Sequence, residues 1–212
     1  MKNQRYATAS SVVSIGGGMQ DAMAQDAATR REQEKVILQR CRNGDRRAYG
    51  HVVETYQAKV FGTILRMVGS RTAAEDITQE AFVRAYVNID RFDPERPFLP
   101  WILRIAINLS YNWFKAAARR EVPDLPHEEF LQFQKNRPID ERLGDIQRME
   151  NALQAIPPKY RIPLILKHVE GMDYKEIKEV LGTPITALKM RVSRARSMLR
   201  KILSDMEQDN VQ

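Results

Sequence analysis

The chain has 212 residues and a formal net charge of +7, and 43% of its residues are hydrophobic and 29% charged. This composition allows buried cores and excludes a wholly disordered chain, while the excess of basic residues favours a polyanionic partner. A single cysteine and three scattered histidines exclude an internal disulfide and a multi-cysteine zinc site, and every long apolar stretch is interrupted well before the roughly 20 residues that span a bilayer.

The N-terminal segment, residues 1–33, holds Ser-rich and Ala-rich sequence with Gly16-Gly17-Gly18, and it lacks the charged and apolar blocks of a signal peptide. We expect a disordered tail there. Cys41 is expected to pack inside a helix without any chemistry of its own, as suits a reducing cytoplasm. The sequence therefore predicts a cytoplasmic protein with no membrane insertion.

Apolar residues recur at helical spacing from about residue 34 onward, and no convincing alternating run is found, which predicts an all-α protein. The first helix is expected to end at Asn43-Gly44-Asp45, where Gly44 adopts left-handed backbone and Asp45 caps the second helix. The second helix is expected to end at Gly69-Ser70. Thr72 and Glu75 have the spacing of a capping box, which predicts the start of a third helix.

The loop 90–97 contains two prolines and an Asp-Pro step and must interrupt the helix; a fourth helix is expected from Phe98 to Arg120. Residues 121–147 change character, with three prolines among acidic residues, and are typical of a flexible linker. The pattern predicts two small helical domains, residues 34–120 and 148–204, and a C-terminal tail at 205–212.

The C-terminal domain has the pattern of a helix-turn-helix. Asp173 and Glu176 predict a capping box for a short helix that ends at Gly182. Thr183 suits the N-cap and Pro184 the first position of the final helix, so two helices meet across a tight turn.

The final helix combines an apolar stripe with basic flanks. Residues 184–201 include six basic side chains and no acidic one, whereas a solvated helix usually mixes both signs. This helix is therefore expected to enter the major groove of duplex DNA, with base edges and phosphates as its targets and Arg191 suited to either. The expected DNA contacts are Thr183, Thr186, Lys189, Met190, Arg191, Ser193, Arg194 and Arg196.

The fourth helix carries a second candidate surface. Basic, aromatic and amide side chains recur on one ridge, a mixture that can stack on unpaired bases while holding their backbone. The alternative is that the cations are simply solvated and the aromatic residues belong to the core, where Trp101 is expected to lie. The ridge consists of Arg104, Asn108, Tyr111, Lys115 and Arg119, with Asn112 and Arg120 at its edge.

Two groups of motifs resemble one known family. Asp76-Ile-Thr-Gln-Glu-Ala-Phe82, Trp101-Ile-Leu-Arg-Ile-Ala-Ile-Asn108 and Arg119-Arg120 resemble region 2 of bacterial extracytoplasmic-function sigma factors. In the second half, Ile156-Pro-Pro-Lys-Tyr-Arg161, Glu170-Gly-Met-Asp-Tyr174 and Val192-Ser-Arg-Ala-Arg196 resemble region 4 of the same family. The resemblance covers about residues 35–203 and implies a sigma-70 family factor of the extracytoplasmic-function class, group 4, with no cofactor, no metal and no catalytic residues.

The resemblance implies specific partners. It implies binding to core RNA polymerase through a coiled coil of the large subunit and through the flap, and to promoter DNA as duplex at the −35 element and as single strand at the −10 element. It also implies a stress or envelope-response regulon and an anti-sigma factor.

The resemblance also assigns residues to these contacts. The polymerase-binding residues by position are Asp76, Gln79, Glu80 and Phe82. The ridge of the fourth helix corresponds to the −10 and melting positions. The loop 90–97 corresponds to the segment that captures a flipped-out base, for which Phe92, Asp93 and Arg96 supply suitable chemistry.

Two rival functions are disfavoured by the sequence. A transcriptional regulator with a C-terminal helix-turn-helix would carry a sensory N-terminal domain, and the alternating strands and helices of a receiver type are not found. An enzyme would need a Ser/His/Asp set, a metal-ligand cluster or a phosphate-cradling glycine loop, and the sequence shows none of these. The tail 1–33 is longer than is usual in the family, which fits either a regulatory segment or a misassigned translation start.

Overall fold

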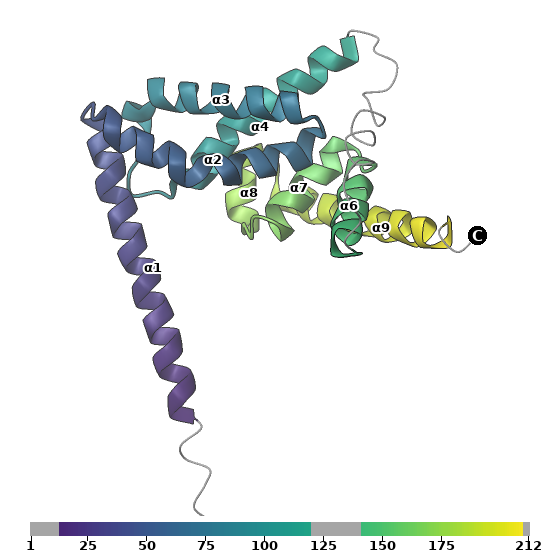
Figure 1. Cartoon of the computed structure of the whole chain (residues 1–212), viewed down its shortest axis with the longest axis horizontal. Helices are drawn as coiled ribbons and strands as arrows, with labels where there is room; N and C mark the ends of the chain where they lie inside the picture. The colour runs from purple at the N-terminus through teal and green to yellow at the C-terminus, as the bar shows by residue number, and fades with distance from the viewer. Residues whose placement is uncertain (1–12, 120–140, 210–212) are drawn as a thin grey trace, which may run out of the picture. The chain divides into compact units, whose positions relative to one another are not determined.

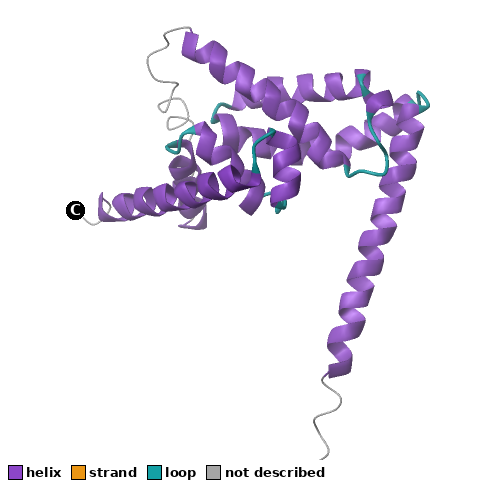
Figure 2. Ribbon diagram, turned by 180° about the vertical axis from the view of Figure 1, so that it is seen from behind, coloured by secondary structure: helices purple, strands orange, loops and turns teal. Residues whose placement is uncertain are grey.

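The computed structural model describes residues 13–119 and 141–209. Throughout these residues the chain is helical and contains no strand (Figures 1 and 2), which confirms the all-α prediction for this part of the chain. Contacts divide the chain into two units, one made of the sequence up to Val52 together with Asp93–Pro97, the other of the remainder. The elements are α1 (Val13–Arg42), α2 (Arg46–Val68), α3 (Arg71–Val87), the short 3-10 helix η1 (Ile89–Arg91), α4 (Phe98–Arg119), α6 (Glu141–Gln154), α7 (Pro158–His168), α8 (Tyr174–Leu181) and α9 (Ile185–Asp209).

The first helix corrects the expected tail. α1 begins at Val13, inside the segment 1–33 that was expected to be disordered. The sequence from Met19 to Ala28 is rich in Ala, Met and Gln, and these helix-favouring residues outweigh the three glycines that precede them.

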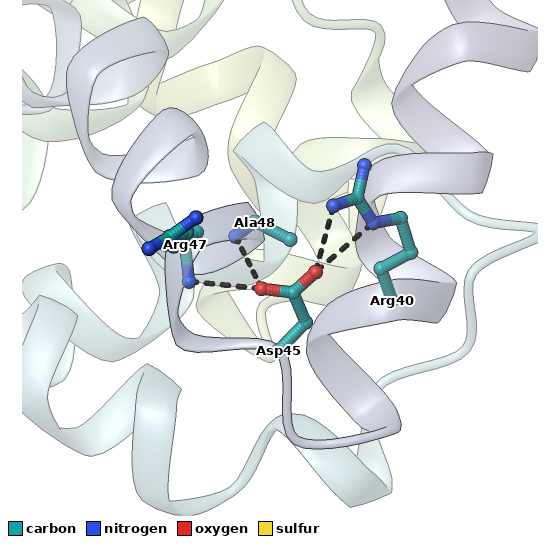
Figure 3. A network of polar contacts seen from close by, with 4 residues as sticks. All are labelled: Arg40, Asp45, Arg47 and Ala48. Atoms are coloured by element: carbon teal, nitrogen blue, oxygen red, sulfur yellow. Dashed lines mark hydrogen bonds and ion pairs between the residues drawn. The ribbon is translucent and has the colours of Figure 1, made fainter.

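The corner between α1 and α2 follows the expected pattern. Gly44 has a φ of +87°, the left-handed backbone that glycine adopts without strain. The Asp45 carboxylate accepts hydrogen bonds from the backbone N–H groups of Arg47 and Ala48 at 3.0 and 3.1 Å, and its other oxygen accepts two from the Arg40 guanidinium at 3.1 and 2.8 Å (Figure 3). Asp45 thus caps α2, as the sequence predicted, and also connects it to Arg40 in the last turns of α1.

The start of α3 differs from prediction. The N-cap is Ser70, whose hydroxyl accepts a hydrogen bond from the Ala73 N–H, and Thr72 already lies within the helix. Both Ser and Thr cap helices well, and Gly69, with a φ of +79°, turns the chain so that Ser70 takes the role. The Thr72–Glu75 capping box is therefore wrong.

The core of the region 2 half lies along α2, α3 and α4. α3 packs on α4, and the side chains of Ile64, Ile102 and Ile107 are fully buried. An aromatic cluster covers one end of α4, where the rings of Phe92, Phe98 and Trp101 lie 4.9 to 5.6 Å apart and Tyr56 of α2 lies 5.2 Å from Phe98. Trp101 thus belongs to this cluster, as expected.

The second half is built from α6 to α9. α9 packs against α6, α7 and α8, and its buried Val192 and Ala195 meet Leu153, Ile156 and Leu164 in one apolar cluster. Helix α6 begins at Glu141 and α9 continues to Asp209, so the expected linker (121–147) and C-terminal tail (205–212) are both partly helical. The helical parts of these stretches, residues 141–147 and 205–209, contain no proline, the residue that a helix interior tolerates least.

Candidate nucleic-acid interface

The first helix of the helix-turn-helix, α8, has the expected caps. The Asp173 carboxylate accepts hydrogen bonds from the backbone N–H groups of Lys175 and Glu176 at 2.7 and 2.8 Å, and the Glu176 carboxylate in turn accepts one from the Asp173 N–H at 2.7 Å. These bonds hold the pKa of Asp173 below its usual value of 3.8, chiefly through the Glu176 N–H. Gly182 ends α8 with a φ of +62°. The capping box and the turn are therefore confirmed.

The start of the final helix is shifted by one residue. α9 begins at Ile185, and the Pro184 carbonyl accepts the first helical hydrogen bond from Leu188 N–H at 3.0 Å. Pro184 thus stands at the N-cap. The Thr183 hydroxyl donates to the Leu181 carbonyl at 3.4 Å and accepts from the Arg191 guanidinium at 3.5 Å. The hydrogen bond between Thr183 and Arg191 therefore connects the turn to α9, and both side chains are half-buried.

The two faces of α9 differ sharply. Leu188, Val192 and Ala195 are at most 3% exposed and form the apolar stripe. Arg194 lies 3.5 Å from the Tyr160 hydroxyl, and this hydrogen bond lowers the pKa of Tyr160. Lys189 lies 5.9 Å from the centre of the Tyr174 ring. The exposed candidates on this face are Thr186, Lys189, Met190, Ser193, Arg194 and Arg196.

The ridge on α4 is only partly open. Arg104, Asn108, Asn112 and Lys115 are exposed, whereas Tyr111 is half-buried. α4 contacts α8, and Arg191 lies close enough to Tyr111 to act on its phenol electrostatically. Burial is the larger effect and raises the pKa of Tyr111. The half-buried rings of Trp113 and Phe114 meet edge to face at 5.3 Å, as the core alternative expects.

Two members of the ridge add little here. Arg119 is the last residue of α4, and Arg120 lies outside the described residues.

The loop before α4 forms a tight turn at Asp93–Arg96. The Arg96 N–H donates to the Asp93 carbonyl at 2.9 Å, and the Glu95 N–H donates to the Asp93 carboxylate at 3.0 Å. Asp93 and Arg96 are exposed. Phe92 is only 3% exposed because its ring belongs to the aromatic cluster, so it offers little surface for stacking in this arrangement, and its contact with a flipped-out base stays a prediction.

The four residues expected to bind polymerase all lie on α3 but differ in exposure. Asp76, Gln79 and Glu80 are exposed on α3, and Glu80 pairs with Arg84 at 2.6 Å. Phe82 is 6% exposed and belongs to the core, so it offers little surface to a partner, and its contact with polymerase stays a prediction.

Sequence reasoning missed two neighbours of Phe82. Val83 and Val87, one helical turn apart, are 53% and 71% exposed. Two valines four residues apart on an otherwise polar helix face could have indicated this exposed apolar surface from the sequence.

The described residues, 13–119 and 141–209, contain no cluster of His, Cys, Asp or Glu that could hold a metal ion. No helix within those ranges is long and apolar enough to cross a membrane.

Both parts of the chain match known protein families. Residues 52–120 match Sigma-70 region 2, and residues 146–199 match Sigma-70, region 4. The ECF RNA polymerase sigma factor SigW of Bacillus subtilis is 33% identical over 186 residues, covering 81% of this chain and 97% of that protein. The RNA polymerase sigma-H factor of Pseudomonas aeruginosa is 32% identical over 188 residues, covering 82% and 96%.

Solved structures agree on the fold. CnrH in complex with the cytosolic domain of CnrY superposes with a TM-score of 0.59 at 23% identity, covering 81% of this chain and 97% of that one. The sigma factor RpoE of Bartonella quintana, in complex with the anti-sigma factor NepR, gives 0.59 at 20% identity, covering 74% and 96%. The chain therefore belongs to the extracytoplasmic-function class of sigma-70 family RNA polymerase sigma factors, which bind core RNA polymerase and promoter DNA.

Proposed function

We propose that this sigma factor acts in the cytoplasm and directs RNA polymerase to the promoters of a stress or envelope-response regulon, with α9 reading the −35 element. The observation that supports this most directly is the exposed face of α9 opposite its buried stripe, which up to Lys201 carries basic and neutral side chains and no acidic one. A helix with this distribution can lie in the major groove while its apolar side stays in the protein core.

Within α9 the contacts divide by chemistry. Thr186, Lys189, Met190, Ser193 and Arg194 are the candidates for base edges, and Arg196 for a phosphate. Arg191 and Thr183 support the turn through their mutual contact, and their role in DNA binding is to set the entry of the helix.

At the −10 element, α4 offers amide and basic side chains to a separated strand. Asn108 and Asn112 can read base edges, while Arg104 and Lys115 hold phosphates. Tyr111 is half-buried and lies within electrostatic reach of Arg191 in this arrangement, so it can stack on a base only after it becomes more exposed. Because α4 contacts α8, we expect promoter opening to follow separation of α8 and α9 from α4.

Polymerase binding is assigned to the exposed face of α3. Its polar members are Asp76, Gln79 and Glu80, and Val83 and Val87 add exposed apolar surface at its edge. A mixed acidic and apolar face suits a basic helical partner such as the coiled coil of the large subunit, and the region 4 half would contact the flap.

An anti-sigma factor is a further proposed partner. Both similar solved structures are complexes of a sigma factor with another protein, named CnrY in one and the anti-sigma factor NepR in the other.

Run-off transcription tests the proposal. Core polymerase with the purified protein should initiate at selected promoter fragments, whereas the protein alone should bind the same duplex weakly. A transcriptional regulator would instead bind its site tightly by itself and would give core polymerase no promoter specificity. That result would reject the sigma-factor function.

A further inference from the structure

The turn Asp93–Arg96 does not stand alone, because α1 contacts both of its central residues. The Arg31 guanidinium donates a hydrogen bond to the Pro94 carbonyl at 3.2 Å. One turn further along α1, the Lys35 ammonium pairs with the Glu95 carboxylate at 2.6 Å. Arg31 and Lys35 are four residues apart and therefore project from the same side of the helix.

Arg31 is itself fixed in place. Its second terminal nitrogen pairs with the Glu34 carboxylate at 2.6 Å, and the two side chains are 33% and 19% exposed. A guanidinium has several donors in a rigid plane, so one group can hold Glu34 and the Pro94 carbonyl together. The pairing of Lys35 with Glu95 raises the pKa of Lys35, so that side chain stays charged over the whole physiological range.

The turn also has hydrogen bonds of its own. Asp93 accepts from the N–H groups of Glu95 and Arg96, and Pro94 at the second position has the fixed φ that such a turn needs. The turn is thus rigid within itself, and Arg31 and Lys35 attach its middle to α1. Its two ends, Asp93 and Arg96, keep exposed side chains.

We propose that Arg31 and Lys35 of α1 are positioning residues that set base preference at the −10 element by holding the turn Asp93–Arg96 in one orientation. The inference deepens the proposed function, since it rests on this turn contacting a −10 base. Neither α1 residue need touch DNA. They act by limiting the orientations in which Asp93 and Arg96 meet the base, and a single orientation discriminates better than an ensemble.

The test uses reconstituted holoenzyme and a promoter library randomised at the −10 and −35 elements, with transcripts counted by sequence. Lys35→Glu should reduce the preference for the best −10 base by about two- to five-fold, the range expected for one exposed ion pair. Arg31→Ala should have a similar effect. Preference at the −35 element should not change, because α9 is untouched.

A charge swap separates positioning from a general structural role. Glu95→Lys alone should behave as Lys35→Glu does, and the double variant carrying both changes should regain most of the original −10 preference. Arg30→Glu is the matched control, since Arg30 is an exposed cation on the same helix next to Arg31. It should leave base preference unchanged.

Two failures are distinguishable. If Asp93→Ala and Arg96→Ala leave −10 preference unchanged, the turn does not read the base and that part of the proposed function is wrong. If those two variants alter preference but the Arg31 and Lys35 variants do not, or if the charge swap adds to the defect instead of restoring preference, the turn reads the base and the positioning role of α1 is wrong.

Discussion

The hydroxyl of Thr63 on α2 donates a hydrogen bond to the carboxylate of Glu170, which follows α7 and lies more than one hundred residues later in the chain. The Glu170 side chain is 3% exposed. Its second oxygen is buried without a hydrogen bond, and the nearest cation, Lys59 Nζ, lies 3.7 Å away. A buried carboxylate thus joins α2 to the segment that follows α7, and one of its two oxygens accepts no hydrogen bond.

This contact predicts that Thr63→Val destabilises the free protein. The substitution keeps the shape of the side chain but removes the donor to a buried carboxylate, which should lower stability by about 1–3 kcal/mol. Thermal unfolding monitored by circular dichroism measures the change. Thr63→Ser is the control and should unfold near the parent temperature, because it retains the hydroxyl; equal losses in both variants would assign the effect to packing.

Arg161 predicts a larger loss. Its guanidinium is buried and donates to the Gln154 carbonyl at 2.9 Å and, more weakly, to that of Leu153 at 3.4 Å, so it supplies a charged donor to carbonyls at the end of α6. Burial lowers the pKa of Arg161 to about 10, so the side chain is still charged at neutral pH. Arg161→Met should destabilise the fold by about 2–4 kcal/mol, because those carbonyls lose a charged donor. Chemical denaturation measures this, and an unchanged midpoint would show that water replaces the donor.

Asp173 predicts a pH dependence. Its pKa is below 3.8 in the folded state, so the cap adds stability above about pH 4 and that stability is lost as the pH falls through the folded value. Asp173→Ala should lower the melting temperature by a few degrees at pH 7, and the difference from the parent should shrink as the pH falls below about 4. Melting curves measured across this pH range check this. A difference that stays the same at every pH would mean that the carboxylate charge does not matter to the cap.

Local signals in the sequence predicted the local structure well. Gly44 with Asp45, and Asp173 with Glu176, lie where they were expected because a cap depends on residues within one turn of the helix. The periodicity of α9 likewise predicted its buried stripe. These features need no information about the rest of the fold.

Burial of particular aromatic residues could not be predicted in this way. Phe82 and Phe92 lie within motifs expected to contact a partner, yet each is buried by side chains distant in the sequence. The contacts of Arg31 and Lys35 with the turn at Pro94 are separated by about sixty residues and leave no periodic trace. Nonlocal packing decides both, so the structure was needed to correct the candidate site.

The corrected face of α3 makes Phe82 and Val87 a contrasting pair. Phe82→Ala should destabilise the isolated protein by about 3–5 kcal/mol, since it removes a buried ring. Val87→Asp should leave thermal stability nearly unchanged and weaken binding to core polymerase by roughly ten-fold, since it places a charge at an exposed apolar contact. Thermal unfolding and a binding titration with core polymerase separate the two effects. Equal polymerase affinity in Val87→Asp and the parent would remove Val87 from the interface.

Salt dependence can sort the exposed residues of α9. Holoenzyme bound to a promoter loses affinity with rising salt, and removing one phosphate contact reduces the slope of log K against log salt by roughly one unit. Arg196→Ala should therefore lower the slope and weaken all promoters alike, whereas Ser193→Ala and Met190→Ala should keep the slope and alter the preferred −35 sequence. Arg148→Ala on α6 is the control, because Arg148 is an exposed cation paired with Asp145 and lies away from the reading helix in sequence. If Arg196→Ala changes base preference without changing the slope, Arg196 contacts a base and its assignment to a phosphate is wrong.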